Sequence, residues 1–219
     1  MKQERAARTR KALVEAAALE FDRHGYEGTS LARVSRTARI SLGALTFHFA
    51  SKAELADTVL TQGFRAARGT AEQVLTREES ALRSVVDLTL ALTRLLEEDP
   101  SVRAAARLVR ERTSSAKGRS PVWAPLVEEL LVCGRWDGLR PSADPRVVVA
   151  MADYLIAGAE EQVRQWAGTT QEGRGRAEGQ LAAIWELALR GIQEDPAAHR
   201  PEARDLGPPD GPLPPGSPR

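Results

Sequence analysis

Residues 29–51 restrict the fold of this chain most tightly, because they indicate two short helices joined by a tight turn. Thr29 and Ser30 each offer a hydroxyl group that can accept a hydrogen bond from an unpaired backbone N–H at a helix start. Ser41 offers the same cap to the second helix, and the small Gly43 follows it. This pattern is typical of a helix-turn-helix, whose second helix enters the major groove of DNA. Capped helix pairs also occur in other all-α proteins, so the pattern alone leaves both interpretations open.

The distribution of charge supports a DNA partner for the N-terminal part. The whole chain carries a formal charge of only +1, but residues 1–52 hold ten Lys or Arg against five acids, a net charge of +5. The remaining residues hold 21 basic and 25 acidic side chains, a net charge of −4. A basic part on a mildly acidic body favours a polyanion at the first part only. Without the helix pair, a solvated charged face would be the preferred explanation.

Composition and periodicity predict an all-α fold. Aromatic residues make up only 5% of the chain, and Ala, Leu, Glu and Arg, which favour helices, are abundant. No stretch alternates in the way expected of a half-buried strand. Ser51 and Glu54 form a capping box. About nine helices are expected: one over residues 7–24, two within residues 29–51, and one each over residues 51–74, 78–98, 101–112, 122–136, 145–166 and 176–192.

The chain divides into three expected parts. Residues 1–51 would form a helix-turn-helix domain, preceded by a polar basic arm at residues 1–10. Residues 52–193 would form a helical body, whose last two helices have broad apolar faces. These faces either cover a large core or bury surface against a second subunit. Residues 194–219 contain eight prolines and little to bury, so we expect this tail to be disordered.

Several other classes of protein are disfavoured by the sequence. Cys133 is the only cysteine, so neither an intrachain disulfide nor a cysteine-based metal site is expected. His24, His48 and His199 lack metal-binding spacing, and no phosphate-binding loop or nucleophile elbow is found, so we expect neither a cofactor nor an enzyme. The N-terminus lacks a signal-peptide pattern, and the longest apolar run is too short to span a bilayer. A cytoplasmic protein is therefore expected.

Residues 9–60 carry a resemblance to a known family. They include Phe-Asp-Arg-His-Gly-Tyr-Glu-Gly-Thr-Ser-Leu, Ile-Ser-Leu-Gly-Ala-Leu-Thr-Phe-His-Phe and Ser-Lys-Ala-Glu-Leu, and together they resemble, without gaps, the DNA-binding domain of TetR-type bacterial repressors. Finer similarity lies in the body, at residues 99–103, 107–108, 123 and 181–192. With Phe47-His48-Phe49, these positions resemble the γ-butyrolactone autoregulator receptors of Streptomyces and their pseudo-receptor relatives. The resemblance covers residues 5–193.

This resemblance implies an all-helical homodimeric repressor. The N-terminal domain would bind a palindromic operator, and the larger domain would hold a small-molecule pocket. Dimerisation would use the last two long helices, and ligand binding would move the two DNA-binding heads and release the DNA. The ligand would be a diffusible lactone or furan hormone that controls antibiotic production.

The resemblance also assigns DNA-contacting residues. The recognition helix would be Ser41–Phe47, and Gly43 would let the backbone approach the DNA. Two positions depart from the family pattern, because Leu42 stands in place of a basic or hydroxyl residue and Thr46 in place of Tyr. Leu42 can meet a thymine methyl but cannot form a hydrogen bond. Residues expected at base edges or phosphates are Arg5, Arg8, Thr29, Arg33, Ser41, Leu42, Gly43, Ala44, Thr46, Phe47, His48 and Lys52.

Candidate ligand contacts come from the resemblance and from helical periodicity. Trp123 matches the pocket tryptophan of the receptors, which stacks on the ligand, although a core aromatic is the alternative. Thr89 and Gln162 are candidate polar anchors in an otherwise apolar pocket. The other candidates, which are equally compatible with an ordinary core, are Leu88, Leu92, Leu108, Val127, Leu131 and Tyr154.

Two further hypotheses compete with the repressor. Leu42 and Thr46 motivate a small-molecule-binding helical protein in which DNA binding is weakened or lost. A pseudo-receptor that answers to antibiotics is the other. The sequence itself does not name the hormone, the operator or the regulated genes.

Overall fold

The computed structural model describes residues 2–75, 79–112, 124–166 and 175–193. Every regular element in these ranges is an α-helix, and an isolated bridge joins Leu139 to Gln193. The prediction of an all-α fold is confirmed. The helices are α1 (Lys2–Gly28), α2 (Leu31–Ala38), α3 (Leu42–His48), α4 (Lys52–Leu75), α5 (Ala81–Glu98), α6 (Pro100–Arg112), α7 (Ala124–Cys133), α8 (Pro145–Trp166) and α9 (Arg176–Ile192).

The expected helix ends agree with these bounds to within about three residues for α4 to α6, α8 and α9. The expected basic arm is wrong in part, because residues 2–6 already belong to α1. An ion pair one helical turn apart, from Arg8 to Glu4 at 2.7 Å, supports this first stretch. At the other end, Gly25 adopts a φ of 69° and interrupts the helix as predicted.

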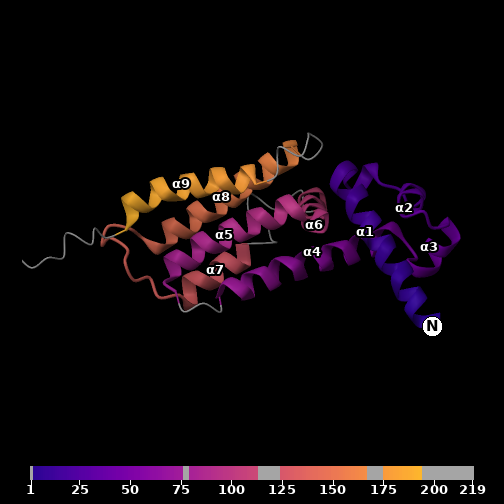
Figure 1. Cartoon of the computed structure of the whole chain (residues 1–219), viewed down its shortest axis with the longest axis horizontal. Helices are drawn as coiled ribbons and strands as arrows, with labels where there is room; N and C mark the ends of the chain where they lie inside the picture. The colour runs from indigo at the N-terminus through magenta and orange to yellow at the C-terminus, as the bar shows by residue number, and fades with distance from the viewer. Residues whose placement is uncertain (1, 76–78, 113–123, 167–174, 194–219) are drawn as a thin grey trace, which may run out of the picture.

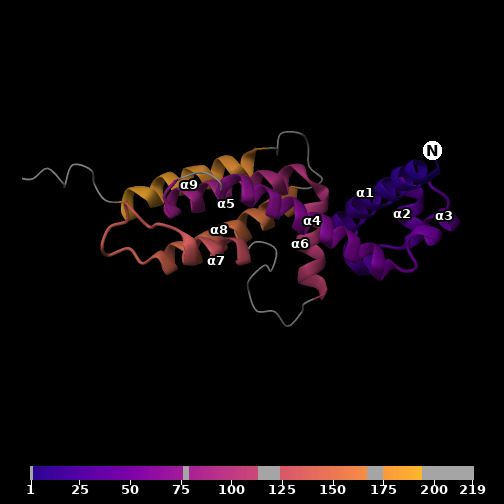
Figure 2. The ribbon, with the colours of Figure 1, turned by 90° about the horizontal axis from the view of Figure 1, so that it is seen from below.

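The molecule is elongated, with two groups of helices at opposite ends (Figure 1). We call α1, α2, α3 and the first half of α4 the head, and α5, α7, α8 and α9 the body. Figure 2 shows α6 crossing the long axis between them, at a steep angle to α4. The tail at residues 194–219, the loop at 113–123 and the segment at 167–174 lie outside the described residues.

Two hydrophobic cores correspond to the two groups. The head core gathers Leu13, Phe21, Val34, Leu45 and Phe49, together with apolar residues of α4 and α6. The body core is larger and is built from α5, α7, α8, α9, the second half of α4 and one side of α6. The helices α4 and α6 therefore contribute side chains to both cores.

The crossing of α4 and α6 is very close at Gly63. A Cβ atom on Gly63 would lie 2.5 Å from the Ala105 side chain and 2.7 Å from the carbonyl oxygen of Ser101. Real Cβ atoms do not approach other atoms so closely, so only glycine lets the two helix backbones touch here. The sequence indicates Gly63 only as a weak point of a helix, whereas the structure gives it a packing role.

Long-range polar contacts organise the body. Trp185 is buried and donates its ring N–H to the hydroxyl of Thr89 at 2.8 Å, which joins α9 to α5. The start of α9 has no side-chain cap of its own. Glu97 of α5 supplies the missing acceptors, at 3.0 Å from the N–H of Gly175 and 2.9 Å from that of Ala177. A carboxylate at a helix N-terminus also opposes the positive end of the helix dipole.

Candidate DNA-binding and ligand-binding sites

The helix-turn-helix forms as its caps predict. The hydroxyl of Ser30 accepts from the N–H of Arg33 at 3.2 Å, and that of Ser41 accepts from Ala44 at 3.3 Å. Between the helices, Arg39 takes a left-handed φ of 55°. This conformation costs about 1–2 kcal/mol in a residue other than glycine. The hydroxyl of Ser35 holds the turn by donating to the carbonyl of Ile40 at 2.5 Å.

A buried polar cluster fixes the helix pair on α1. Glu20 is nearly buried and accepts from the hydroxyl of Thr37 at 2.6 Å, so this carboxylate links α1 to α2. The prediction that Thr29 meets phosphate is wrong for this structure, because Thr29 is only 2% exposed. Its hydroxyl donates to the carbonyls of Gly25 at 2.7 Å and Glu20 at 3.1 Å. Thr29 therefore closes the end of α1 instead of facing outward.

The outer face of α3 is a continuous exposed stripe. Leu42, Gly43, Thr46 and Phe47 follow the spacing of one helical face, whereas Leu45 is buried beneath them. Leu42 is 46% exposed and Phe47 is 84% exposed. A Cβ placed on Gly43 would meet no atom within 4 Å, so the backbone is open to an approaching groove. We call Leu42, Gly43, Thr46 and Phe47 the α3 stripe.

The polar groups of α3 are largely engaged within the helix. The hydroxyl of Thr46 donates to the carbonyl of Gly43 at 3.1 Å, and that of Ser41 serves as the cap. His48 lies half-buried against Phe47, edge to face with 5.4 Å between ring centroids. Ala44 is also half-buried. Among the predicted contacts on α3, the α3 stripe and Ser41 are therefore the most accessible.

Two predicted phosphate-binding cations lie on the helices that precede and follow α3 in the chain. Arg33 is exposed, with its guanidinium 3.7 Å from Glu20 and 3.5 Å from His24. Lys52 donates to the carbonyl of Tyr26 at 2.9 Å and lies 4.2 Å from the centre of its ring. The Lys52 ammonium group therefore already donates a hydrogen bond within the protein, which leaves it fewer donors for a phosphate. Arg5 and Arg8 are exposed on the first turns of α1.

The start of α4 is fixed by a variant of the predicted capping box. The N–H of Glu54 donates to the hydroxyl of Ser51 at 3.1 Å as predicted, but the Glu54 carboxylate accepts from the N–H of Ala50 at 2.8 Å, one residue before the expected Ser51. This arrangement orders the chain between α3 and α4 and so positions Lys52.

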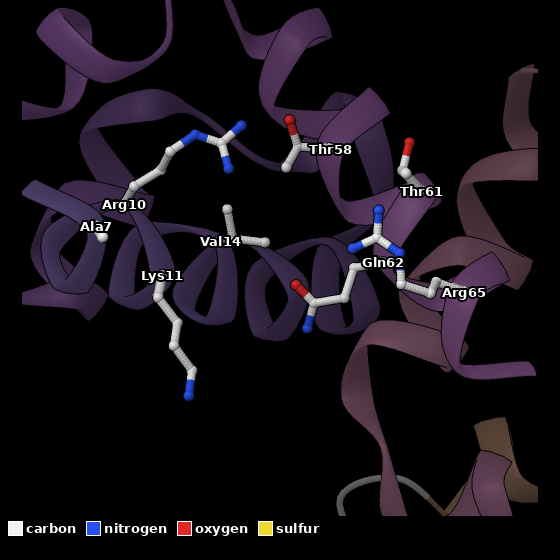
Figure 3. A pocket seen from close by; sticks show the side chains of 8 residues that line it. All are labelled: Ala7, Arg10, Lys11, Val14, Thr58, Thr61, Gln62 and Arg65. Carbon is white, nitrogen blue, oxygen red and sulfur yellow. The ribbon is translucent and has the colours of Figure 1, made fainter. Parts of the chain in front are cut away.

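A cationic groove that the sequence did not reveal lies between α1 and α4 (Figure 3). It encloses about 540 Å³, and in the described part of the chain no acidic side chain lines it. The guanidinium groups of Arg10 and Arg65 point toward this space, whereas Lys11 extends away. The groove continues the positive surface of the head from α1 onto α4. Helical periodicity indicates on which face of its helix Arg10 or Arg65 lies. It does not show that the two faces meet until the crossing of α1 and α4 is known.

The head is tied to α6 by ion pairs and hydrogen bonds. Arg103 donates to the Asp22 carboxylate at 2.8 Å and to the carbonyl of Leu96 at 2.7 Å. Arg107 donates to the carbonyl of Asp22 at 2.8 Å. Burial raises the pKa of Asp22 above its ordinary value, against the opposing effect of the Arg103 guanidinium. The head is therefore attached to α6 by a partly desolvated ion pair.

A second attachment lies at the end of α6. The carboxylate of Glu111 accepts from the N–H of Tyr26 at 2.6 Å and from Arg107 at 2.7 Å. Arg112 pairs with Asp57 of α4. Further along, Arg110 pairs with the buried Glu160 of α8, so α6 contacts head and body through charged groups on the same helix.

Some candidate ligand contacts lie together in the body. Leu88, Leu92 and Val127 are buried in the body core. Thr89 lies on the same helix, but its hydroxyl donates to the carbonyl of Val86 at 2.8 Å and accepts from Trp185. Trp123 lies outside the described residues, as does the side chain of Leu131.

Three ligand-contact predictions are wrong for this structure. Leu108 belongs to the head core, because α6 turns that face toward α1 and α4. Tyr154 is 80% exposed on the outer face of α8. The side-chain amide of Gln162 donates to Gln180 of α9 at 3.0 Å near the surface. Periodicity correctly identified helical faces, but it did not identify which neighbour each face meets.

Large apolar side chains are exposed on α8 and α9, which lie side by side (Figures 1 and 2). Val147 and Tyr154 project from α8, and Ile184 and Leu187 project from α9. A monomeric protein rarely leaves several large apolar groups uncovered on neighbouring helices. We call these four residues the α8–α9 face.

No group of three or more His, Cys, Asp or Glu side chains in the described ranges is placed to hold a metal ion. No helix in those ranges is long and apolar enough to cross a membrane.

Residues 13–59, which span most of the head, match the family model of bacterial regulatory proteins of the tetR family. The A-factor receptor protein of Streptomyces griseus is 31% identical over 208 residues, covering 93% of this chain and 71% of that protein. The matching family is one of regulatory proteins and the similar protein is a receptor, as the sequence resemblance implied.

Solved structures agree with this assignment. A crystal structure of a gamma-butyrolactone receptor (ArpA-like protein) has a TM-score of 0.69 at 30% identity, covering 90% of this chain and 92% of the other. The TetR family protein CprB from Streptomyces coelicolor, in complex with its biological operator sequence, has a TM-score of 0.66 at 30% identity, with coverages of 90% and 94%. The chain therefore belongs to the tetR family of bacterial regulatory proteins and, within it, is a γ-butyrolactone receptor-like protein.

Proposed function

We propose that this protein is a homodimeric repressor that binds a palindromic operator and releases it when a small diffusible signal binds. The signal is of γ-butyrolactone or furan type, and the controlled genes direct antibiotic biosynthesis. Residues 1–51 carry the DNA-binding function, and residues 52–193 bind the ligand and dimerise.

The exposed outer face of α3 is the observation that carries this proposal. The α3 stripe lies on the head, at one end of the molecule. Arg33 lies on α2 and Lys52 begins α4, the helices that precede and follow α3 in the chain. Phosphate contacts from such cations fix the register of a protein on DNA, while the helix in the groove reads the bases. CprB, a relative of similar fold, was solved with its operator.

The body core is the proposed place of the ligand. Leu88, Leu92 and Val127 supply apolar surface, and Trp123 remains the proposed stacking residue. The names of two relatives, an A-factor receptor and a gamma-butyrolactone receptor, support a lactone as the ligand class. Because α6 bonds to Asp22 on one side and to Glu160 on the other, a shift of α6 would reach the head directly.

Dimerisation through α8 and α9 follows from their uncovered apolar side chains. A second copy related by a two-fold axis would bury the α8–α9 face against itself. Two heads held in this way would meet two half-sites on one side of the DNA, which is why the operator is proposed to be palindromic.

An electrophoretic shift with the promoter DNA that flanks the protein's own gene tests DNA binding. Retardation at low salt, abolished by a butyrolactone or a furan, is the expected result. No retardation of any such fragment at low salt would contradict the proposal. A thermal-shift screen with butyrolactones, furans and antibiotics then identifies the signal, because a ligand that binds only the folded state raises the melting temperature. A response to antibiotics alone would instead indicate a pseudo-receptor.

A helical small-molecule-binding protein without DNA binding is the second candidate. It is favoured by Leu42 and by Thr46, whose hydroxyl is turned back to the carbonyl of Gly43. The variant L42K/T46Y distinguishes the two candidates. If the natural protein has lost DNA binding, this variant should bind promoter DNA that the natural protein does not bind. Tight binding of promoter DNA by the natural protein would exclude the second candidate.

A further inference from the structure

We propose that the α3 stripe reads thymine methyl groups, so that Leu42 and Phe47 determine operator specificity through apolar contact instead of hydrogen bonds. This inference rests on the proposed function, because it concerns the same DNA-binding surface. It adds the kind of base contact that Leu42 and Phe47 make, which is apolar contact with a methyl group.

The amino-acid types of α3 lead to this assignment. The helix runs Leu-Gly-Ala-Leu-Thr-Phe-His and contains no Arg, Lys, Asn or Gln. Bidentate recognition of guanine requires Arg or Lys, and bidentate recognition of adenine requires Asn or Gln. The main hydrogen-bonding code of the major groove is therefore closed to α3 itself.

The few hydroxyl groups of the helix do not restore that code. Thr46 uses its hydrogen in the bond to the carbonyl of Gly43, which leaves its methyl group at the surface of the stripe. The oxygen of Ser41 already accepts from the N–H of Ala44, so its O–H can give a base at most a single hydrogen bond and not a bidentate pair. His48 is half-buried against Phe47.

Apolar groups, in contrast, are abundant and exposed on the same face. Leu42 and Thr46 are four residues apart, as are Gly43 and Phe47, so the four residues form two neighbouring rows, about 100° apart, on the exposed side of α3. Leu42 is 46% exposed, and Phe47 is 84% exposed although its ring meets His48 edge to face, so much of both apolar side chains is left uncovered within the chain. The only apolar group that a base presents in the major groove is the C5 methyl of thymine. Gly43, with open space above it, lets the helix approach close enough for this contact.

Replacing thymine by uracil removes this methyl group and nothing else, which makes the inference testable. Duplexes bound by the natural protein would first be selected from a random pool. Each thymine of the half-site would then be replaced by uracil in turn. We expect at least one position per half-site at which the Kd rises about four-fold per methyl removed, which corresponds to one buried methylene-sized group.

Variants assign the methyl contact to individual residues. L42A or F47A should abolish the thymine-to-uracil difference at the position that the side chain covers, while T46V, which keeps the methyl and loses the hydroxyl, should preserve it. Circular dichroism would establish that each variant is folded. F47L serves as a second probe at the aromatic position, because it keeps an apolar side chain and should retain discrimination.

The results separate this inference from the proposed function. Equal affinity for thymine and uracil duplexes at every position, or discrimination that survives in both L42A and F47A, overturns methyl readout while leaving the repressor intact. Selection of a half-site without thymine has the same consequence. Failure to select any duplex overturns the proposed function itself.

Discussion

The head and the body of this protein reach their structures in different ways. In the head, helix starts are specified by neighbouring residues, as at Ser30, Ser41 and Ser51. In the body, α9 begins with an acceptor from α5, and Trp185 is oriented by Thr89, 96 residues away in the sequence. Local caps therefore start these three helices of the head, while the start of α9 in the body depends on a contact between distant segments.

The two regions also differ in what they leave exposed. The head presents an apolar α3 stripe bordered by cations, whereas the body presents the larger α8–α9 face. The first surface suits a polyanion with apolar groups in its groove, and the second suits a copy of itself. Four predictions test this contrast, beginning with the largest effect.

The double variant Y154E/L187E should convert the protein from dimer to monomer. Tyr154 and Leu187 are 80% and 69% exposed in the single chain. If a second copy still covered the α8–α9 face of the variant, two carboxylates per copy would have to be desolvated, which is costly. Sedimentation velocity should give the mass of one chain, 23.8 kDa, where the natural protein gives twice that value. T61E, on the exposed surface of α4, is the matched control. A variant that remains dimeric would place the interface elsewhere.

W185A should destabilise the protein by about 3–5 kcal/mol, since it removes a fully buried aromatic side chain. W185F should cost less, because it retains most of the buried volume and loses chiefly the hydrogen bond to Thr89. Urea unfolding followed by circular dichroism measures both. Equal losses in the two variants would mean that the bond to Thr89, and not the buried volume, supports α9.

S51A should lower the free energy of unfolding by about 1 kcal/mol, the usual contribution of a serine cap. S80A removes the equivalent cap of α5, whose hydroxyl accepts from the N–H of Arg83, and should have a similar effect. S51D, which can still accept the same bond, is the control. A much larger loss in S51A than in S80A, measured by urea unfolding, would show that this cap also orders the segment between α3 and α4.

The Asp22–Arg103 contact predicts a dependence on pH. Because burial raises the pKa of Asp22, the folded state holds this proton more tightly than the unfolded state does. The stability contributed by this carboxyl is thus greatest below the unfolded value and falls as pH rises through the raised pKa. The difference in unfolding free energy between natural protein and D22N should therefore decrease as pH increases from acid toward neutral.

Urea unfolding of both proteins at matched pH values measures this difference. A difference that grows with pH would mean that attraction to Arg103 outweighs desolvation. The contact joins the head to α6, so the direction of the pH dependence shows whether desolvation or attraction dominates at this attachment.

The sequence predicted the head more completely than the body for the same physical reason. Caps and helix periods depend on residues within a few positions, so the helix pair and the capping box were predictable. Which face meets which neighbour depends on tertiary packing, so Leu108 was assigned to a ligand pocket although it belongs to the head core. Tyr154 was assigned inward because an apolar face does not reveal whether its partner lies in the same chain.

Thr29 illustrates another limit. A threonine at a helix start can cap its own helix, meet a phosphate or close the preceding helix, and the three roles look alike in sequence. The actual bonds run to carbonyls of α1, and they depend on the break at Gly25. The cationic groove at Arg10 and Arg65 was likewise invisible until α1 and α4 were placed together.

The close contact with α6 at Gly63 is a point about which α4 can tilt. Gly63 lies eleven residues from Lys52, so about 16 Å of helix separate the touching point with α6 from the end that adjoins α3. A tilt of α4 by about 5° around this point would displace that end by about 1.4 Å, given this arm. In the proposed dimeric repressor, the absence of a side chain at Gly63 would therefore determine how far a small movement of α6 displaces each head relative to its operator half-site.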